Sequence, residues 1–253
     1  MDKAIYMAVN SIKADKIKQI NAVHEVANVS TVGFKKAFDL TVNTYRVDMP
    51  GSFSSRYLLT PEELGIVDLM PGSRMATGQP LDIFIEGDGV LGVLNDEGEI
   101  AFTRRGDLRV SSDGVLVNGE GRVIAAEGGG QIELQPDLLY RISRDGVIYS
   151  SNTEEEVAED VQVSQLLLRD ASNTKLEKTP DGLFKVYGEA VGDFEGGENQ
   201  IRVTSQALEG SSVKTYDILA QMIEIERSYE MKINIVEQLK ELDDSSATLM
   251  QTA

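Results

Sequence analysis

Apolar residues recur at helical spacing at the two ends of the chain. Near the amino terminus they follow each other every three or four residues, with Lys16 as the polar exception, so they lie on one stripe of a helix. A second stripe runs over about residues 211–243. The first stripe contains Ile5, Val9, Ile12, Ile20, Val23 and Ala27, and the second contains Ile218, Met222, Ile225, Tyr229, Ile233, Val236 and Leu239.

Between the two ends the apolar positions alternate with a period of two, which is typical of strands. Turn signals such as Asp88-Gly89, Asp113-Gly114 and Asn118-Gly119 separate these short segments. Many short strands at this spacing predict a β-sandwich or a barrel-like core. The sequence therefore predicts a mainly β protein flanked by long N- and C-terminal α-helices.

The change of period divides the chain into four segments. Breakers such as Pro50-Gly51 and Pro71-Gly72 indicate an extended connector after the first helix. An acidic run over 154–160 would divide the β-rich core into two pieces, 81–150 and 161–204. We expect an N-terminal helix and turn (1–36), a connector (37–80), a β-rich core (81–204) and a C-terminal helix (205–253).

Two interpretations of the terminal stripes remain open on periodicity alone. Both helices could cover a sheet within one globular domain. Alternatively, they could pair with each other as a coiled coil and with the helices of neighbouring subunits.

Composition narrows the classes of partner and cofactor. The 253 residues include 42 acidic and 24 basic side chains, and the resulting net charge of -18 disfavours binding to nucleic acid or to an anionic membrane. No apolar run approaches the roughly 18 residues of a membrane span, and residues 4–9 lack the context of a cleavable signal peptide. With no cysteine and a single histidine, His24, we expect no metal and no cofactor.

Only one motif suggests catalytic chemistry. Residues 87–92, GDGVLG, match the dinucleotide-binding pattern G-x-G-x-x-G, but no helix is predicted after them. We therefore interpret the motif as a hairpin turn. Nothing else in the sequence singles out a catalytic site, so we expect that the protein is not an enzyme.

The stretch that ends the first helix, ANVSTVGFKK at 27–36, resembles the signature of the axial proteins of the bacterial flagellum. That signature runs roughly Asn-Leu-Ala-Asn-x-Ser/Thr-Thr-x-Gly-Phe/Tyr-Lys/Arg. Glu25 and Val26 depart from it. The matching residues are Ala27, Asn28, Ser30, Thr31, Gly33, Phe34 and Lys35.

Three further blocks are similar to the same family and occur in the same order. They are 70–89, with MPGSRMATGQPLD and GDG; 102–117, with FTRRGDL and DGVLV; and 208–230, with LEGSSV and MI to RSYE. Ser212, Glu226 and Lys232 replace residues that are common in the family. The likeness thus extends over the whole chain.

The resemblance implies a structural subunit of the flagellar basal-body rod, of the proximal type by its opening residues and length, with the distal-rod type as the alternative. It implies export by the flagellar type III apparatus without a cleaved signal peptide, and assembly with copies of itself and other axial subunits in the periplasm. The terminal helices would form an inner coiled-coil layer, and the stripes together with Asn28, Gly33 and Phe34 would form the assembly interface. A soluble ligand-binding β-protein with covering helices is the alternative from another class.

Overall fold

The computed structural model describes residues 2–37, 40–47, 56–63, 65–135, 138–151 and 161–251. The chain forms two compact units. The helical unit comprises Met1–Ala27, Phe38–Leu64 and Lys214–Ala253, and the β unit comprises Asn28–Ala37 and Gly65–Val213. A mainly β chain with one long helix at each end confirms the predicted class. The acidic run at 154–160 lies outside the described residues.

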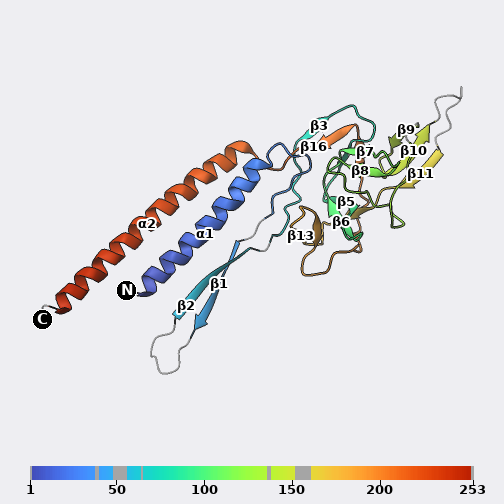
Figure 1. Ribbon diagram of the computed structural model, residues 1–253. Coiled ribbons are helices and arrows are strands. Elements are labelled where there is room, and N and C mark those ends of the chain that lie inside the picture. Colours follow the sequence, from blue (N-terminus) through green and yellow to red (C-terminus); the bar gives the residue numbers. More distant parts are fainter. Residues whose placement is uncertain are drawn as a thin grey trace. The chain divides into compact units, whose positions relative to one another are not determined.

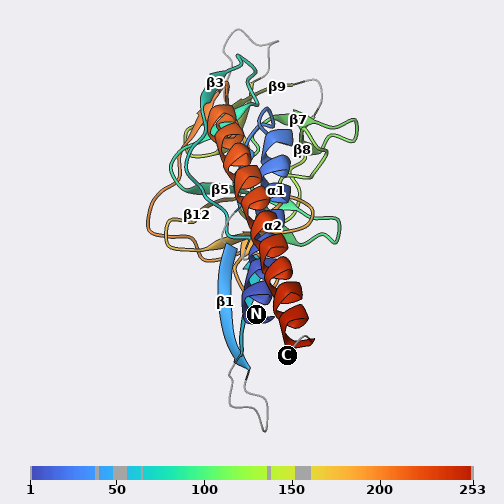
Figure 2. The same cartoon turned by 90° about the vertical axis from the view of Figure 1, so that its left-hand side faces the viewer.

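The helical unit contains two long antiparallel helices, α1 (Asp2–Ala27) and α2 (Thr215–Gln251). They lie side by side in both views, with the chain's two termini at the same end of the pair (Figures 1 and 2). The predicted contact between the terminal helices is therefore confirmed. Within the described residues, neither helix is long and apolar enough to cross a membrane.

A polar cluster joins the two helices. The buried Asp15 carboxylate of α1 accepts hydrogen bonds from Lys232 Nζ at 2.5 Å and from Ser228 Oγ at 3.0 Å, both on α2. Lys232 also donates to the carbonyl oxygen of Ser11 at 3.4 Å. A buried polar contact of this kind fixes the register of a helix pair, because any sliding leaves a charge unpaired. Lys232, which departs from the family pattern, thus has a partner in this chain.

The predicted connector 37–80 contains a hairpin of β1 (Leu40–Val47) and β2 (Arg56–Glu63). The two strands pair antiparallel, with Leu40 opposite Glu63 and Val47 opposite Arg56. The connector is therefore extended in these two segments, and backbone hydrogen bonds pair them as strands.

The β unit consists of short antiparallel strands in several small sheets. Its largest sheet has the order β12-β5-β6-β14-β13, a second has the order β11-β10-β9, and three pairs are β15-β4, β16-β3 and β7-β8. Within the described residues no sheet closes into a barrel. The strands are β3 (Arg74–Ala76), β4 (Ile83–Ile85), β5 (Gly89–Leu94), β6 (Ile100–Thr103), β7 (Leu108–Val110), β8 (Leu116–Asn118), β9 (Leu139–Ile142), β10 (Val147–Ser151), β11 (Val161–Gln165), β12 (Leu168–Asp170), β13 (Leu176–Lys178), β14 (Phe184–Val186), β15 (Val203–Ser205) and β16 (Ala207–Glu209).

Strand β5 is buried on both faces, and its side chains enter two different cores. Leu91 and Val93 pack in the larger cluster with Leu116 and Ile124, whereas Val90 packs in a smaller cluster around Phe102. A strand covered on both sides reads as a continuous apolar run, without the alternation that marks a half-exposed strand. The two clusters supply the apolar burial that stabilises the β unit.

The prediction of a hairpin turn at residues 87–92 is wrong, because the strands before and after the turn do not pair with each other. Gly87 has φ +61° and makes a turn, but β4 and β5 on either side of it belong to different sheets. Gly92 lies inside β5, where an added Cβ would come within 2.4 Å of the Leu167 side chain. The glycines therefore serve the turn and close packing, and a strand follows in place of the helix that dinucleotide binding requires.

Replacing Leu116 with alanine should lower the free energy of unfolding of the β unit by about 3 kcal/mol, because it leaves a cavity in the larger core. Urea denaturation followed by a tertiary-structure signal measures this loss. Leu139→Ala is the matched control, since Leu139 is 61% exposed and its truncation should change stability little. Equal losses in the two variants would contradict this assignment of the core.

Candidate functional site

Most of the predicted apolar stripe of α1 faces away from α2. Ile20 is 57% exposed and Val23 is 52% exposed, while Val9 is also exposed and Ile12 is half-buried. The side chain of Ile5 lies outside the described residues. The buried positions of α1 include Asp15, Ala22 and Glu25, which lie on another side of the helix.

The predicted stripe of α2 is more protected. Ile218 is buried and Tyr229 is 41% exposed, and the rest of the stripe is half-buried: Met222, Ile225, Ile233, Val236 and Leu239. Beyond this stripe, α2 exposes a further set of large apolar side chains that the stripe did not include: Tyr216, Leu219, Ile223, Met231, Ile235 and Leu242. Both helices therefore present apolar surface that the described residues leave exposed.

The remaining predicted residues, Asn28, Gly33 and Phe34, lie in the β unit and order the segment after α1. The backbone N–H and the hydroxyl of Thr31 donate to the backbone and side-chain oxygens of Asn28, which forms a turn. Gly33 donates its N–H to the Glu209 carbonyl oxygen at 2.7 Å, and Phe34 accepts from the Ser212 N–H at 3.0 Å. The segment after α1 is thus bonded to the segment before α2.

Three charged side chains are buried where these segments meet. Glu209 Oε1 lies 2.7 Å from Lys35 Nζ, and Glu209 Oε2 lies 2.9 Å from Arg104 Nε. All three side chains are at most 1% exposed. We call Lys35, Arg104 and Glu209 the buried ion triad.

Backbone groups also bind the triad, although the buried Arg104 Nη2 has no hydrogen-bond partner among the described residues. Lys35 Nζ donates to the carbonyl oxygens of Leu69 and Met70, and Arg104 Nη1 donates to those of Gly87 and Gly89. The Gly72 N–H donates to Glu209 Oε1 at 2.7 Å. Two cations and one carboxylate give the triad a formal charge of +1, so these carbonyl dipoles share in stabilising it.

The triad shifts the pKa of two of its members. Burial alone would raise the pKa of Glu209, but the charge and hydrogen bond of Arg104, and then those of Lys35, lower it below its usual value. Burial and the charge of Arg104 lower the pKa of Lys35, and the opposing effects of Glu209 and Asp68 do not restore it. At neutral pH the carboxylate is therefore ionised between its two partners.

Sequence reasoning missed the triad, although each member lies in one of the resembling blocks. Lys35 is the last matching residue of the first block, Arg104 lies in FTRRG and Glu209 lies in LEGSSV. Spacing cannot reveal a contact between residues 174 positions apart. The signal that could have indicated the triad is the presence of basic and acidic residues among glycine and apolar residues. A charged residue in such surroundings needs a partner of opposite charge when it is buried.

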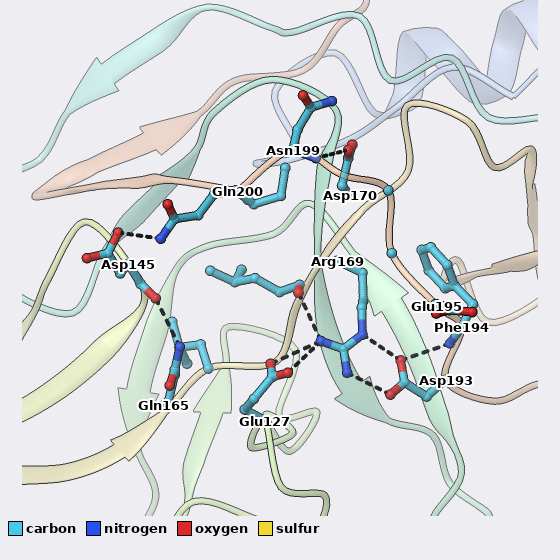
Figure 3. Close-up of a pocket in the computed structure, with 15 residues that line it drawn as sticks. Glu127, Asp145, Gln165, Arg169, Asp170, Asp193, Phe194, Glu195, Asn199 and Gln200 are labelled. Atoms are coloured by element: carbon cyan, nitrogen blue, oxygen red, sulfur yellow. Dashed lines mark hydrogen bonds and ion pairs between the residues drawn. The ribbon is translucent and has the colours of Figure 1, made fainter.

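A polar hollow of about 690 Å³ offers the alternative of ligand binding (Figure 3). Its wall is occupied by internal contacts: Arg169 lies between Glu127 and Asp193 at 2.8 Å from each, and Asp170 accepts from Ser172. Among the described residues no group of acidic or histidine side chains could hold a metal ion. The hollow thus gives no support for a ligand.

The chain has a long helix towards each end and a β unit between them in sequence, and the four sequence blocks that resemble the flagellar axial proteins meet at the buried ion triad. The resemblance places the chain in the class of flagellar axial proteins. Comparison with known proteins agrees. Residues 84–150 match the family described as the flagellar hook protein FlgE/F/G D1 domain. Residues 204–249 match the flagellar basal body rod FlgEFG protein C-terminal family.

Relatives align along the whole chain. The flagellar basal-body rod protein FlgF of Salmonella typhimurium is 30% identical over 99% of each chain. FlgF of Escherichia coli is 29% identical over 99% of this chain and 98% of its own. FlgG of Bacillus subtilis is 25% identical over 93% of this chain and 94% of its own. The chain belongs to the family of flagellar basal-body rod proteins, and within it resembles FlgF.

Gly33→Ala should disrupt the docking of the segment after α1. Gly33 has φ +66°, and an added Cβ would come within 2.5 Å of the Arg104 carbonyl oxygen. We expect a loss in the free energy of unfolding of about 3 kcal/mol or more, from backbone strain plus the clash. Gly98→Ala is the control, because Gly98 has φ +81° but open space around it, and should cost only about 1–2 kcal/mol. Chemical denaturation measures both, and equal losses would contradict the close approach.

The lowered pKa of Glu209 predicts a loss of stability in acid. The carboxyl binds a proton more readily in the unfolded chain, near its ordinary pKa of 4.5, than in the folded chain. Its contribution is therefore complete above about pH 5 and is lost as the pH falls through the folded pKa. Urea unfolding at pH 7 and pH 4 should show a smaller loss for Glu209→Gln than for the parent protein. Identical losses would contradict a triad-dependent pKa.

Proposed function

We propose that the chain is a structural subunit of the proximal part of the flagellar rod, and that its two helices form a coiled-coil inner layer with the helices of neighbouring subunits. The family relationship supports the rod assignment. The observation that carries the inner layer is the exposed apolar surface on both helices. Contiguous exposed apolar surface is characteristic of proteins that associate.

The two helices pair through a partly polar seam and leave large apolar groups in solvent. Asp15, Ser228 and Lys232 occupy the seam, whereas Ile20 and Ile223 are each more than half exposed. A helix in a monomeric protein normally turns its apolar stripe towards its own core. We infer that neighbouring subunits cover these side chains in the rod.

Charge favours contact between α1 of one copy and α2 of another. α1 carries four lysines and three acidic residues, whereas α2 carries eight acidic and three basic residues. Lys13, Lys16 and Lys18 on α1 are exposed, as are Glu224, Glu226 and Glu230 on α2. Opposite charges beside the apolar stripes would orient the contact and disfavour α2 against α2. Lys16, the polar exception in the first stripe, would then face an acidic helix.

The same proposal covers location, export and partners. We infer assembly with copies of this chain and with other axial subunits in the periplasmic rod, after export by the flagellar type III apparatus without a cleaved signal peptide. The role requires no catalysis and no cofactor. The distal-rod alternative draws support from the likeness to FlgG of Bacillus subtilis, and the higher identity to FlgF of Salmonella typhimurium favours the proximal type.

Ile223→Asp should abolish rod assembly without unfolding the protein. Ile223 is 55% exposed, so a charge there should cost the isolated chain little, while it would be buried in the assembly at a prohibitive cost. The measurement is motility in soft agar, and rods in purified basal bodies, in a flagellated strain that lacks its own copy. Circular dichroism of the purified variant reports on its fold.

Gln221→Asp provides the matched control. It introduces the same charge on the same helix, at an exposed polar position outside the apolar set. Motility should be close to normal in this variant. Normal motility and rods with Ile223→Asp would overturn the proposed inner layer.

A further inference from the structure

The buried ion triad brings together three parts of the chain that are distant in sequence. Lys35 lies in the segment after α1, Arg104 in the middle of the β unit, and Glu209 at the end of β16. Glu209 is 174 positions from Lys35 and 105 from Arg104. Both cations therefore come earlier in the sequence than the carboxylate that they share.

Without Glu209 the two cations would have no buried anion beside them, and the exposed Asp68 would be the acidic group that still acts on Lys35. The carbonyl oxygens of Leu69 and Met70 bind Lys35, and those of Gly87 and Gly89 bind Arg104, but carbonyls do not neutralise charge. Arginine does not lose its proton in proteins, so its charge persists. Burying two like charges side by side without an anion opposes docking of the segment that carries Lys35.

Glu209 resolves this repulsion because each carboxylate oxygen takes a different cation. β16 places it through antiparallel pairing with β3, where Glu209 lies opposite Arg74. Its own backbone carbonyl then accepts the Gly33 N–H, and Ser212 donates to Phe34 three residues later. Charge neutralisation and backbone bonding thus occur at the same place.

We propose that the triad is an electrostatic latch: the segment 28–37 docks stably on the rest of the β unit only when Glu209 of β16 lies between Lys35 and Arg104. The segment directly follows α1, and residues 210–214 directly precede α2. The latch therefore closes only when both connections to the helices are docked in the β unit. The latch does not depend on the proposed role in the rod.

Hydrogen exchange of the full-length monomer tests the latch through the amides of Gly33 and Ser212. Glu209→Gln leaves the acceptor atoms of both bonds in place, because these are backbone oxygens. We expect it to speed exchange at both amides about a hundredfold, as the buried cations lose their anion. The amide of Ile124, bonded to the Leu116 carbonyl oxygen in the core, is the internal reference.

The double variant Lys35→Met/Glu209→Gln separates repulsion from simple loss of contacts. Removing one cation should relieve the repulsion, so exchange at Gly33 should be at least about tenfold slower than in Glu209→Gln alone. This rescue is expected even if Glu209→Gln by itself unfolds the β unit. Glu120→Gln, at the partly exposed pair with Arg105, is the matched control and should leave exchange unchanged.

Each other outcome overturns the latch. Unchanged exchange in Glu209→Gln would mean that the carboxylate is not needed for docking. Equal exchange in the single and double variants, or complete unfolding of both, would mean that the triad acts through packing and hydrogen bonds without charge repulsion.

Discussion

A single carboxylate between two buried cations holds the ends of the β unit together. Glu209 binds Lys35 and Arg104 through separate oxygens, and the same residue accepts the Gly33 N–H through its backbone. Ion pairs of this depth are poor sources of net stability, because desolvation offsets most of the attraction. Their effect is on specificity: any other arrangement of the two terminal segments leaves a buried charge without its partner.

Periodicity predicted the existence of the helices but not the faces through which they pair. The stripe with Ile20 and Val23 is apolar, yet α1 turns Asp15 and Ala22 inward. A pattern of three and four residues identifies the apolar side of a helix and contains no information about what covers it. The partners of Asp15 lie more than two hundred positions away on α2, so only the folded chain shows why a charged residue is buried there.

The sequence was enough to predict that the middle of the chain is rich in β-strands, but not which strands pair with each other. Turn dipeptides and alternating segments indicate many short strands, but several strands, including β12 to β16, have only three residues, too few for a period to appear. β5 is an interior strand of the largest sheet and is buried on both faces, but its apolar run and its glycines suggested a turn motif. In the three-residue strands and in β5, tertiary contacts decide the strand pairing, and the local sequence pattern does not. The three residues of the triad each belong to a recognisable sequence motif, but only the folded structure shows that they contact one another.

The two units distribute polar and apolar contacts in opposite ways. The β unit buries its apolar residues in two cores, and at the triad it buries a carboxylate between two cations. The helical unit buries Asp15 against Lys232 and leaves Ile20 and Ile223 in solvent. Apolar burial is the main source of association free energy, so the apolar side chains that the helix pair leaves exposed could still contribute to contacts with other subunits. The polar seam meanwhile fixes how the two helices of one chain are aligned before any neighbour arrives.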